Sequence, residues 1–139
     1  MRLIIGLGYA GLIPFLGLNA LSLWPVIPNL AVLELFSRYS AIILAFMAGV
    51  VWPIWLQQAQ WRTLALFAVS LPILSFLAGF LPSLWVLCAQ LLLFIVLRMG
   101  EARLGLDERY PLPYLQLRRR LTWVVVSSHA LMIILWWPR

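Results

Sequence analysis

The sequence contains no lysine, and charged residues of any kind are scarce. Of its 139 residues, 10% are charged and 65% are hydrophobic, and the mean hydropathy is +1.02. A water-soluble domain carries about 25% charged residues. Soluble enzyme folds are therefore excluded, and the composition indicates an integral membrane protein.

Cysteine and histidine are almost absent, with one residue of each. A single cysteine excludes a disulfide within the chain, and the two residues together cannot supply the three or four protein ligands of a usual zinc site. No acidic residue is expected at membrane depth to form an acid–base pair with the histidine. The sequence therefore predicts no metal site, no cofactor and no catalytic residue.

Long apolar runs dominate what is present. A bilayer core of about 30 Å needs roughly 20 apolar residues in a helix, because backbone N–H and C=O groups have no water to bond there. Five runs approach this length, at 3–23, 39–56, 63–80, 83–99 and 121–137. The third and fourth are separated only around Pro82, which predicts a tight antiparallel hairpin. We expect an all-α fold, in which residues 1–139 form one domain, a bundle of five transmembrane helices.

The arginines are distributed unevenly between the two sides of such a bundle. Eight fall on the side of the N-terminus, namely Arg2, Arg62, Arg98, Arg103, Arg109, Arg118, Arg119 and Arg120, and two fall on the opposite side, Arg38 and Arg139. Positive residues are retained on the cytoplasmic side of a membrane. We therefore expect the N-terminus inside and the C-terminus outside.

Small residues and prolines within the runs are interpreted as packing features. Gly6, Gly8 and Gly11 match G-x-G-x-x-G, but a dinucleotide site needs that pattern after a strand, whereas here it lies inside an apolar run. We interpret it as a close helix-packing face.

The second and third runs contain comparable small residues, Ala41, Ala45, Gly49, Ser75 and Gly79, and we expect the three faces to meet. Pro14 and Pro72 are expected to kink their helices.

His129 is the one titratable side chain expected well inside a membrane span, near the middle of the run 121–137. A functional interpretation makes it a proton relay, a donor to a quinone-like headgroup, or one axial haem ligand shared with a partner subunit. The structural interpretation is a neutral imidazole bonded to Asn19, Gln90 or a carbonyl at a kink. We place the candidate intramembrane polar site at these three side chains.

The stretch 100–120 is the one long polar segment and is expected to be an arginine-rich cytoplasmic loop. Arg118, Arg119 and Arg120 stand where anionic headgroups lie. As a structural feature they anchor the topology and contact lipid. As a functional feature they form, together with Asp107, a docking surface or a small headgroup site, and we expect the three arginines to act as a unit.

Three sequence blocks resemble a known family. They are LGYAGLIPF at 7–15, YSAIILAFMAGVVW at 39–52 and LPYLQLRRRLTWVVV at 112–126. With them the chain resembles the small multi-span family of unknown function three-four-two-nine, whose animal relative is called transmembrane protein sixty-nine. The resemblance implies the inner membrane, with the C-terminus in the periplasm of a bacterium, and it implies no reaction. It favours Tyr9, Pro14, Tyr39, Ser40 and Trp52 as shared-site residues.

Taken together, these observations favour a non-catalytic inner-membrane protein that acts as an accessory subunit or assembly factor of a membrane complex, such as a respiratory one. Its expected partners are anionic membrane lipids and either another protein or further copies of itself, and not nucleic acid. The alternative is a small oligomeric transporter or channel, although a transport pathway normally contains more intramembrane polar residues.

Overall fold

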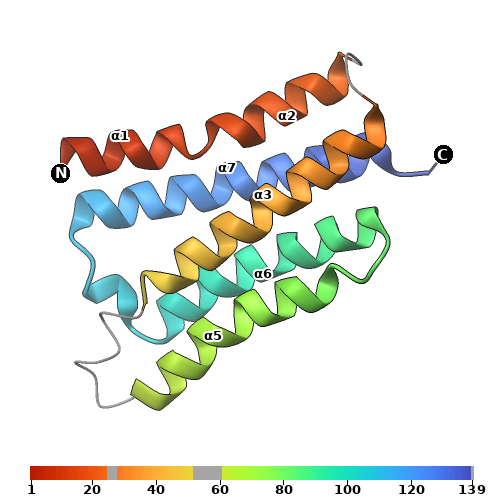
Figure 1. Ribbon diagram of the computed structural model, residues 1–139. Coiled ribbons are helices and arrows are strands. Elements are labelled where there is room, and N and C mark those ends of the chain that lie inside the picture. The colour runs from red at the N-terminus through yellow and green to blue at the C-terminus, as the bar shows by residue number, and fades with distance from the viewer. Residues whose placement is uncertain (25–27, 52–60, 139) are drawn as a thin grey trace.

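The computed structural model describes residues 1–24, 28–51 and 61–138, and throughout these ranges the chain is helical or in short connections. The helices are α1 (Arg2–Ala10), α2 (Ile13–Leu23), α3 (Asn29–Gly49), α5 (Trp61–Ala78), α6 (Ser83–Arg103), the 3-10 helix η1 (Leu106–Glu108) and α7 (Leu112–Trp136). Figure 1 shows α1 and α2 following each other along one line. The all-α fold class is thereby confirmed.

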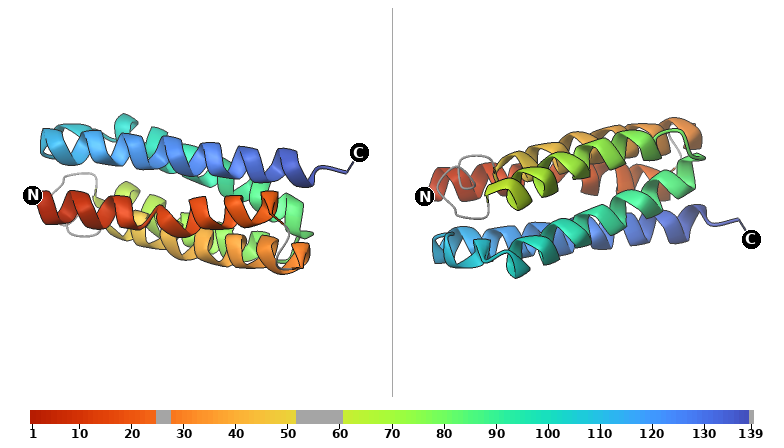
Figure 2. Two further views of the ribbon diagram at one scale, coloured as in Figure 1. Left: turned by 90° about the horizontal axis from the view of Figure 1, so that it is seen from above. Right: turned by 90° about the horizontal axis from the view of Figure 1, so that it is seen from below.

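The long helices pack side by side in a bundle. Figure 2 shows α6 and α7 on one side and α3 and α5 on the other, while α1 and α2 run along α7. If α1 and α2 are taken as one interrupted helix, consecutive long helices are antiparallel, and the two chain ends lie at opposite ends of the bundle (Figure 1). The arginine-rich end holds the N-terminus, η1 and the start of α7, and the opposite end holds the α5–α6 turn.

Within the described residues, three helices are long and apolar enough to cross a membrane, which gives the chain the character of a membrane protein. They are Arg2–Leu23 with its internal break, Asn29–Gly49 and Ser83–Arg103, and Arg62–Ala78 is a shorter apolar helix. The second expected run began at residue 39, but α3 already begins at Asn29. The final part of that run, 52–56, lies outside the described residues.

The expected loop at 100–120 is largely helical, which corrects the prediction. The helix α6 continues to Arg103 and α7 already begins at Leu112, so the connection is short and is mostly η1. Gly105 precedes η1 with a φ of 75°, a left-handed conformation that glycine adopts without strain. Charged residues can extend both helices here because they bond one another across the bundle.

The first long helix is interrupted where α1 meets α2. The amide of Leu12 donates to the carbonyl of Tyr9, three residues back, at 3.0 Å. Pro14 lies in the first turn of α2, where its missing N–H is tolerated. The hydroxyl of Tyr39 donates to the carbonyl of Gly11 at 2.8 Å, so α3 supports the break. Pro72, by contrast, lies inside α5.

The core is apolar and aromatic in the middle of the bundle. Phe15, Phe36 and Phe94 are fully buried there, and the rings of Phe15 and Phe36 pack edge to face with centroids 5.3 Å apart. A second cluster lies at the arginine-rich end and consists of Val51, Leu64, Ala68, Leu106, Tyr110 and Leu115.

The small-residue faces meet only in part, because Ala41 lines one pocket together with Ser75 and Gly79, whereas the face of the first run packs on α7. A methyl group added at Gly8 would lie 2.9 Å from Leu117 Cδ2 of α7, but one added at Gly6 or Gly49 would have no atom within 4 Å. Ala45 is exposed as well. The closest approach involves Gly100 of α6, where a methyl group would overlap the ring of Phe67 in α5. The glycine that permits the tightest helix contact therefore lies outside the predicted faces.

Candidate functional site

Arg118 forms the centre of a buried charge cluster at the arginine-rich end. Its side chain is 3% exposed and that of Glu101 is fully buried. Arg118 Nε donates to Glu101 Oε1 at 2.9 Å and to Oε2 at 2.8 Å, and Nη2 also donates to Oε1. This geometry matches a guanidinium edge to a carboxylate and links α7 to α6.

The same guanidinium also reaches α3. Arg118 Nη2 donates to the backbone carbonyl of Met47 at 2.7 Å. The last carbonyls of a helix lack a donor in the next turn, and the amide of Val51 bonds Ala48 instead. A cation at this position also interacts favourably with the helix dipole. One arginine of α7 thus caps α3 and neutralises an acid of α6.

Arg98 and Asp107 extend the cluster toward the surface. Arg98 Nη1 and Nη2 donate to the two carboxylate oxygens of Asp107 at 2.7 Å and 2.6 Å, and Nη1 also lies 3.4 Å from Glu101 Oε2. Arg119 Nη2 lies 3.6 Å from Asp107 Oδ2. The hydrogen bonds from Arg98 are the largest influence on Asp107 and hold the pKa of its carboxyl below the ordinary value, although burial opposes them.

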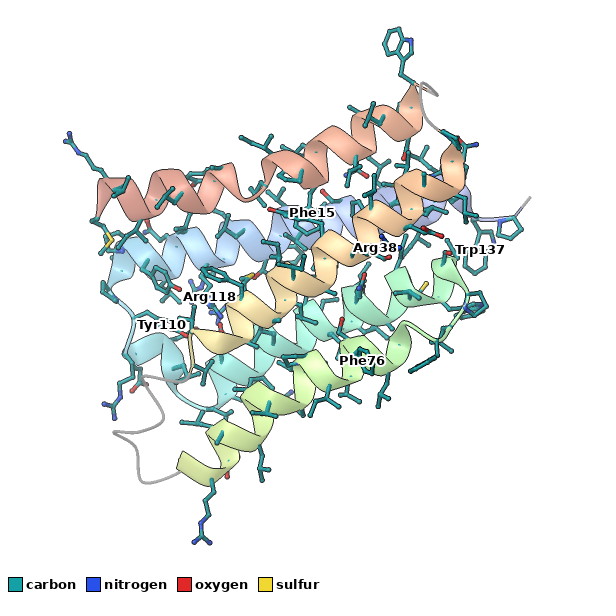
Figure 3. The ribbon with its side chains drawn as sticks, in the orientation of Figure 1. Phe15, Arg38, Phe76, Tyr110, Arg118 and Trp137 are labelled. Atoms are coloured by element: carbon teal, nitrogen blue, oxygen red, sulfur yellow. The ribbon has the colours of Figure 1, made fainter. Side chains whose placement is uncertain are left out.

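The three adjacent arginines point to different places, because consecutive residues of a helix lie about 100° apart. Arg118 is buried, with its guanidinium 5.7 Å from the ring centroid of Tyr110 (Figure 3). Arg119 is 57% exposed beside Asp107. The exposed Arg120 donates to the hydroxyl of Tyr9 at 3.2 Å. In this structure Arg118 is an internal ion-pair partner, Arg119 contacts the outer carboxylate of the same cluster, and Arg120 bonds α1.

His129 occupies the middle of the bundle and is fully buried. Its Nε2 lies 2.8 Å from Ser40 Oγ on α3, and its Nδ1 lies 2.8 Å from the carbonyl of Val125, one turn earlier in α7. A carbonyl only accepts hydrogen bonds, so Nδ1 carries the proton. A neutral ring then leaves Nε2 as an acceptor, and the hydroxyl of Ser40 donates to it. Both ring nitrogens are satisfied without a charge.

A serine hydroxyl directed at a histidine nitrogen is also the arrangement of a nucleophile and its base. Here the pair is enclosed. Ser40 is fully buried, and three aromatic rings surround the imidazole, those of Phe15, Phe36 and Phe94, with centroids 5.8, 4.8 and 5.5 Å away. This geometry supports a structural bond between α3 and α7.

The other two side chains of the predicted intramembrane site lie elsewhere. Gln90 of α6 donates through Nε2 to the carbonyl of Ser37 at 2.9 Å. Asn19 of α2 lines a separate pocket with Ser127 and Ser128. The oxygen atoms of both amide side chains are buried without a partner. Asn19, Gln90 and His129 thus contribute to three separate places, and the partner of His129 was missed.

The residues favoured by the family resemblance lie where helices meet. Tyr39 and Ser40 are neighbours in α3, and one supports the α1–α2 break while the other bonds His129. Tyr9 accepts from Arg120, and Pro14 opens α2. Trp52 lies outside the described residues. Tyr9 and Tyr39 thus join the first helix pair to α7 and α3, and Ser40 joins α3 to α7.

A comparison with protein families gives one match, and two other comparisons give none. A family model described as a protein of unknown function (DUF3429) matches residues 1–134. Searches of curated proteins and of solved structures find no match.

Proposed function

The chain belongs to the DUF3429 family of proteins of unknown function, and from this premise we propose that it is a non-catalytic inner-membrane protein. It serves as an accessory subunit or assembly factor of a larger membrane complex. In this proposal five helices cross the membrane, the arginine-rich end lies in the cytoplasm and the C-terminus lies in the periplasm. The family match agrees with the family that the three sequence blocks indicated.

The observation that carries the proposal is that one arginine of α7 is buried while its two neighbours are exposed. Arg118 forms hydrogen bonds inside the bundle with Glu101 and Met47, whereas Arg119 and Arg120 remain at the surface. The buried pair thereby fixes the helix that presents the two exposed guanidinium groups. An exposed, positioned pair of arginines suits an anionic headgroup or an acidic segment of a partner subunit.

The surface beside these arginines supports a membrane partner. A pocket of about 370 Å³ lies between α6 and α7 and is lined by Arg98, Arg119 and Trp123 together with apolar side chains. Trp123 is 72% exposed. Tryptophan concentrates at the depth of lipid headgroups, where one end of a site is apolar and the other polar. A phosphate at Arg119 with an acyl chain or a partner helix against Trp123 fits this arrangement.

The first helix pair offers a second, apolar surface. No residue of α1 is buried, and Leu3, Leu7, Ile13 and Trp24 are each more than 60% exposed. In a membrane this face meets lipid or another helix. Because α1 is held to α7 by Gly8 and by the bond between Tyr9 and Arg120, this apolar helix pair lies directly beside Arg120.

The transporter alternative would join the internal polar groups into one route. The described groups instead occupy separate places, with His129 and Ser40 among phenylalanine rings, Asn19 between α2 and α7, and Gln90 between α3 and α6. This distribution favours a binding protein over a transporter.

Co-purification tests the proposal. The tagged protein is extracted in a mild detergent, and subunits and lipids are quantified by mass spectrometry. We expect a stoichiometric partner or anionic lipid, and we expect the variant Arg119→Gln/Arg120→Gln to lose it while remaining folded. The matched control is Arg2→Gln/Arg103→Gln, which removes the same charge from exposed positions at the same end. A homo-oligomer without further subunits that is unaffected by either variant would contradict the proposal and favour a transporter.

A further inference from the structure

A polar pocket lies beside the α5–α6 turn, at the end of the bundle opposite the arginine cluster. Its volume is about 360 Å³, within the range of about 300–1,000 Å³ typical of ligand sites. It lies between α3, α5 and α6, with Arg38 on the first and Phe76 on the second, as Figure 3 shows. The proposed function does not use this pocket.

Two buried polar groups in the pocket lack a partner. Gln90 is 1% exposed, and although its Nε2 donates to the carbonyl of Ser37, its Oε1 has no partner among the described residues. Ser75 is 4% exposed, and its hydroxyl is also without a partner. Buried polar atoms in folded proteins are nearly always hydrogen-bonded, to the protein, to water or to a ligand. An amide oxygen only accepts, so a group that bonds Gln90 Oε1 must donate a hydrogen bond.

The rim of the pocket has one charge of each sign. Glu34 and Arg38 are 52% and 74% exposed, and Arg38 Nη2 lies 3.7 Å from Glu34 Oε2. Both residues belong to Asn29–Gly49, one of the helices long and apolar enough to span a membrane. Ionisable groups on such a helix are placed at a lipid headgroup, a polar cavity or another charge, because hydrocarbon does not solvate them.

We propose that this pocket binds the headgroup of a zwitterionic phospholipid with a primary ammonium, that is, phosphatidylethanolamine. The phosphate accepts hydrogen bonds from Arg38. The ammonium donates to the carboxylate of Glu34 and to Gln90 Oε1, and the hydroxyl of Ser75 takes part in the same bonding. Phe76 and Leu81, which are 71% and 49% exposed at the rim, contact the glycerol and the start of the acyl chains.

The chemistry of the headgroup provides the test. Phosphatidylcholine has the same charges and a similar shape, but its quaternary ammonium has no N–H to donate to Gln90. We expect short-chain phosphatidylethanolamine, titrated into the detergent-purified full chain and followed by native mass spectrometry, to bind about tenfold more tightly than short-chain phosphatidylcholine. Phosphatidylglycerol has hydroxyl donors but no ammonium for Glu34, and we expect it to bind more weakly than phosphatidylethanolamine.

Two variants locate the binding in this pocket. We expect Glu34→Gln to weaken phosphatidylethanolamine binding about tenfold and phosphatidylcholine binding less, because the quaternary ammonium is attracted to the Glu34 carboxylate but donates no hydrogen bond to it. The control Glu108→Gln removes an exposed acid at the other end of the bundle and should have no effect. Ser75→Ala removes a hydroxyl that bonds nothing in this structure, so the fold is retained while phosphatidylethanolamine binding weakens.

Equal binding of phosphatidylethanolamine and phosphatidylcholine would overturn the proposal. Equal binding of phosphatidylethanolamine and phosphatidylglycerol, or binding unaffected by Glu34→Gln, would also overturn it. These outcomes leave the proposed function untouched, because they concern the opposite end of the molecule.

Discussion

Two polar clusters hold the bundle together, and they use different groups. At the arginine-rich end, Arg118 and Glu101 join α7, α6 and α3 through charges that are almost completely buried. In the middle of the bundle, His129 and Ser40 join α7 to α3 through neutral hydrogen bonds. Both clusters belong to α7, which therefore carries the polar contacts that position it against α3.

The difference follows from depth. The charged cluster continues outward through Arg98 and Asp107 to the partly exposed Arg119, so its net charge is spread over groups in contact with the surface. His129 is surrounded by phenylalanine rings, where an ionised group would be costly and a neutral imidazole with two partners is not. Charged side chains therefore occur in the cluster that extends to the protein surface, and neutral hydrogen bonds occur in the cluster that is enclosed by apolar rings.

Removing the acid of the charged cluster should have the largest effect. Glu101→Gln leaves Arg118 buried opposite a neutral amide, and breaking a buried pair in this way destabilises a protein by about 3–5 kcal/mol. Thermal unfolding in detergent measures the loss. The control Glu108→Gln should change stability little, since Glu108 is exposed.

The double variant Arg118→Met/Glu101→Leu makes the comparison sharper. Without either charge the carbonyl of Met47 loses its donor, but no unpaired charge is left buried, and we expect the variant to recover part of the stability lost in Glu101→Gln. If the single variant were no less stable than Glu108→Gln, the charged cluster would not stabilise the bundle at all.

Helix packing beside the charged cluster should have the next largest effect. Gly100 precedes Glu101, and a methyl group there overlaps the ring of Phe67, so Gly100→Ala separates α5 from α6. Overpacking of this kind destabilises by about 1–3 kcal/mol. Gly6→Ala is the matched control, because a methyl group at Gly6 has no atom within 4 Å. A second substitution, Phe67→Leu, should restore stability to the Gly100→Ala variant, and failure to do so would assign the loss to another contact.

Substitution in the neutral cluster should lower stability less than Glu101→Gln or Gly100→Ala does. Ser40→Ala leaves His129 Nε2 buried without a donor, which destabilises by about 1–2 kcal/mol. The same substitution in a His129→Leu background should have little further effect, because the acceptor is already gone. Additive losses in this double-mutant cycle would show that the two side chains do not bond each other. A cellular phenotype of His129→Leu in a fully folded protein would instead indicate a functional role for the imidazole.

The positions of the helices could be predicted because apolar runs are a local signal. Each expected run overlaps a helix, although α3 begins ten residues earlier than expected, and the α5–α6 hairpin falls where Pro82 predicted it. The helix ends at the arginine-rich end were wrong for a physical reason. Hydropathy treats Glu101 and Arg118 as solvated residues of a loop, whereas in the structure each provides the partner that lets the other remain in a buried helix.

The candidate site was predictable only in part. The sequence identified His129 as a buried group that needs partners, but Ser40 lies far from it in the chain and carries no local signal for the pairing. Adjacent arginines looked like one feature in the sequence, although helical geometry directs Arg118, Arg119 and Arg120 to different partners. A linear pattern shows which groups need partners, and the packing of the helices decides which partners they receive.

Acidification should affect the outer part of the charged cluster by the smallest amount. The pKa of Asp107 is held below its ordinary value of about 3.9 by the hydrogen bonds from Arg98. A lowered pKa in the folded state stabilises the protein above the ordinary value, and that contribution is lost as the pH falls through the lowered pKa. Because the Asp107 side chain is 20% exposed, we expect this contribution to the free energy of unfolding to be less than about 1 kcal/mol.

The difference in free energy of unfolding between the wild type and Asp107→Asn should therefore be constant from pH 7 to about 5 and should shrink below about pH 4. A difference for Asp107→Asn that remained unchanged down to pH 3 would mean that the carboxylate contributes through its shape and not through its charge.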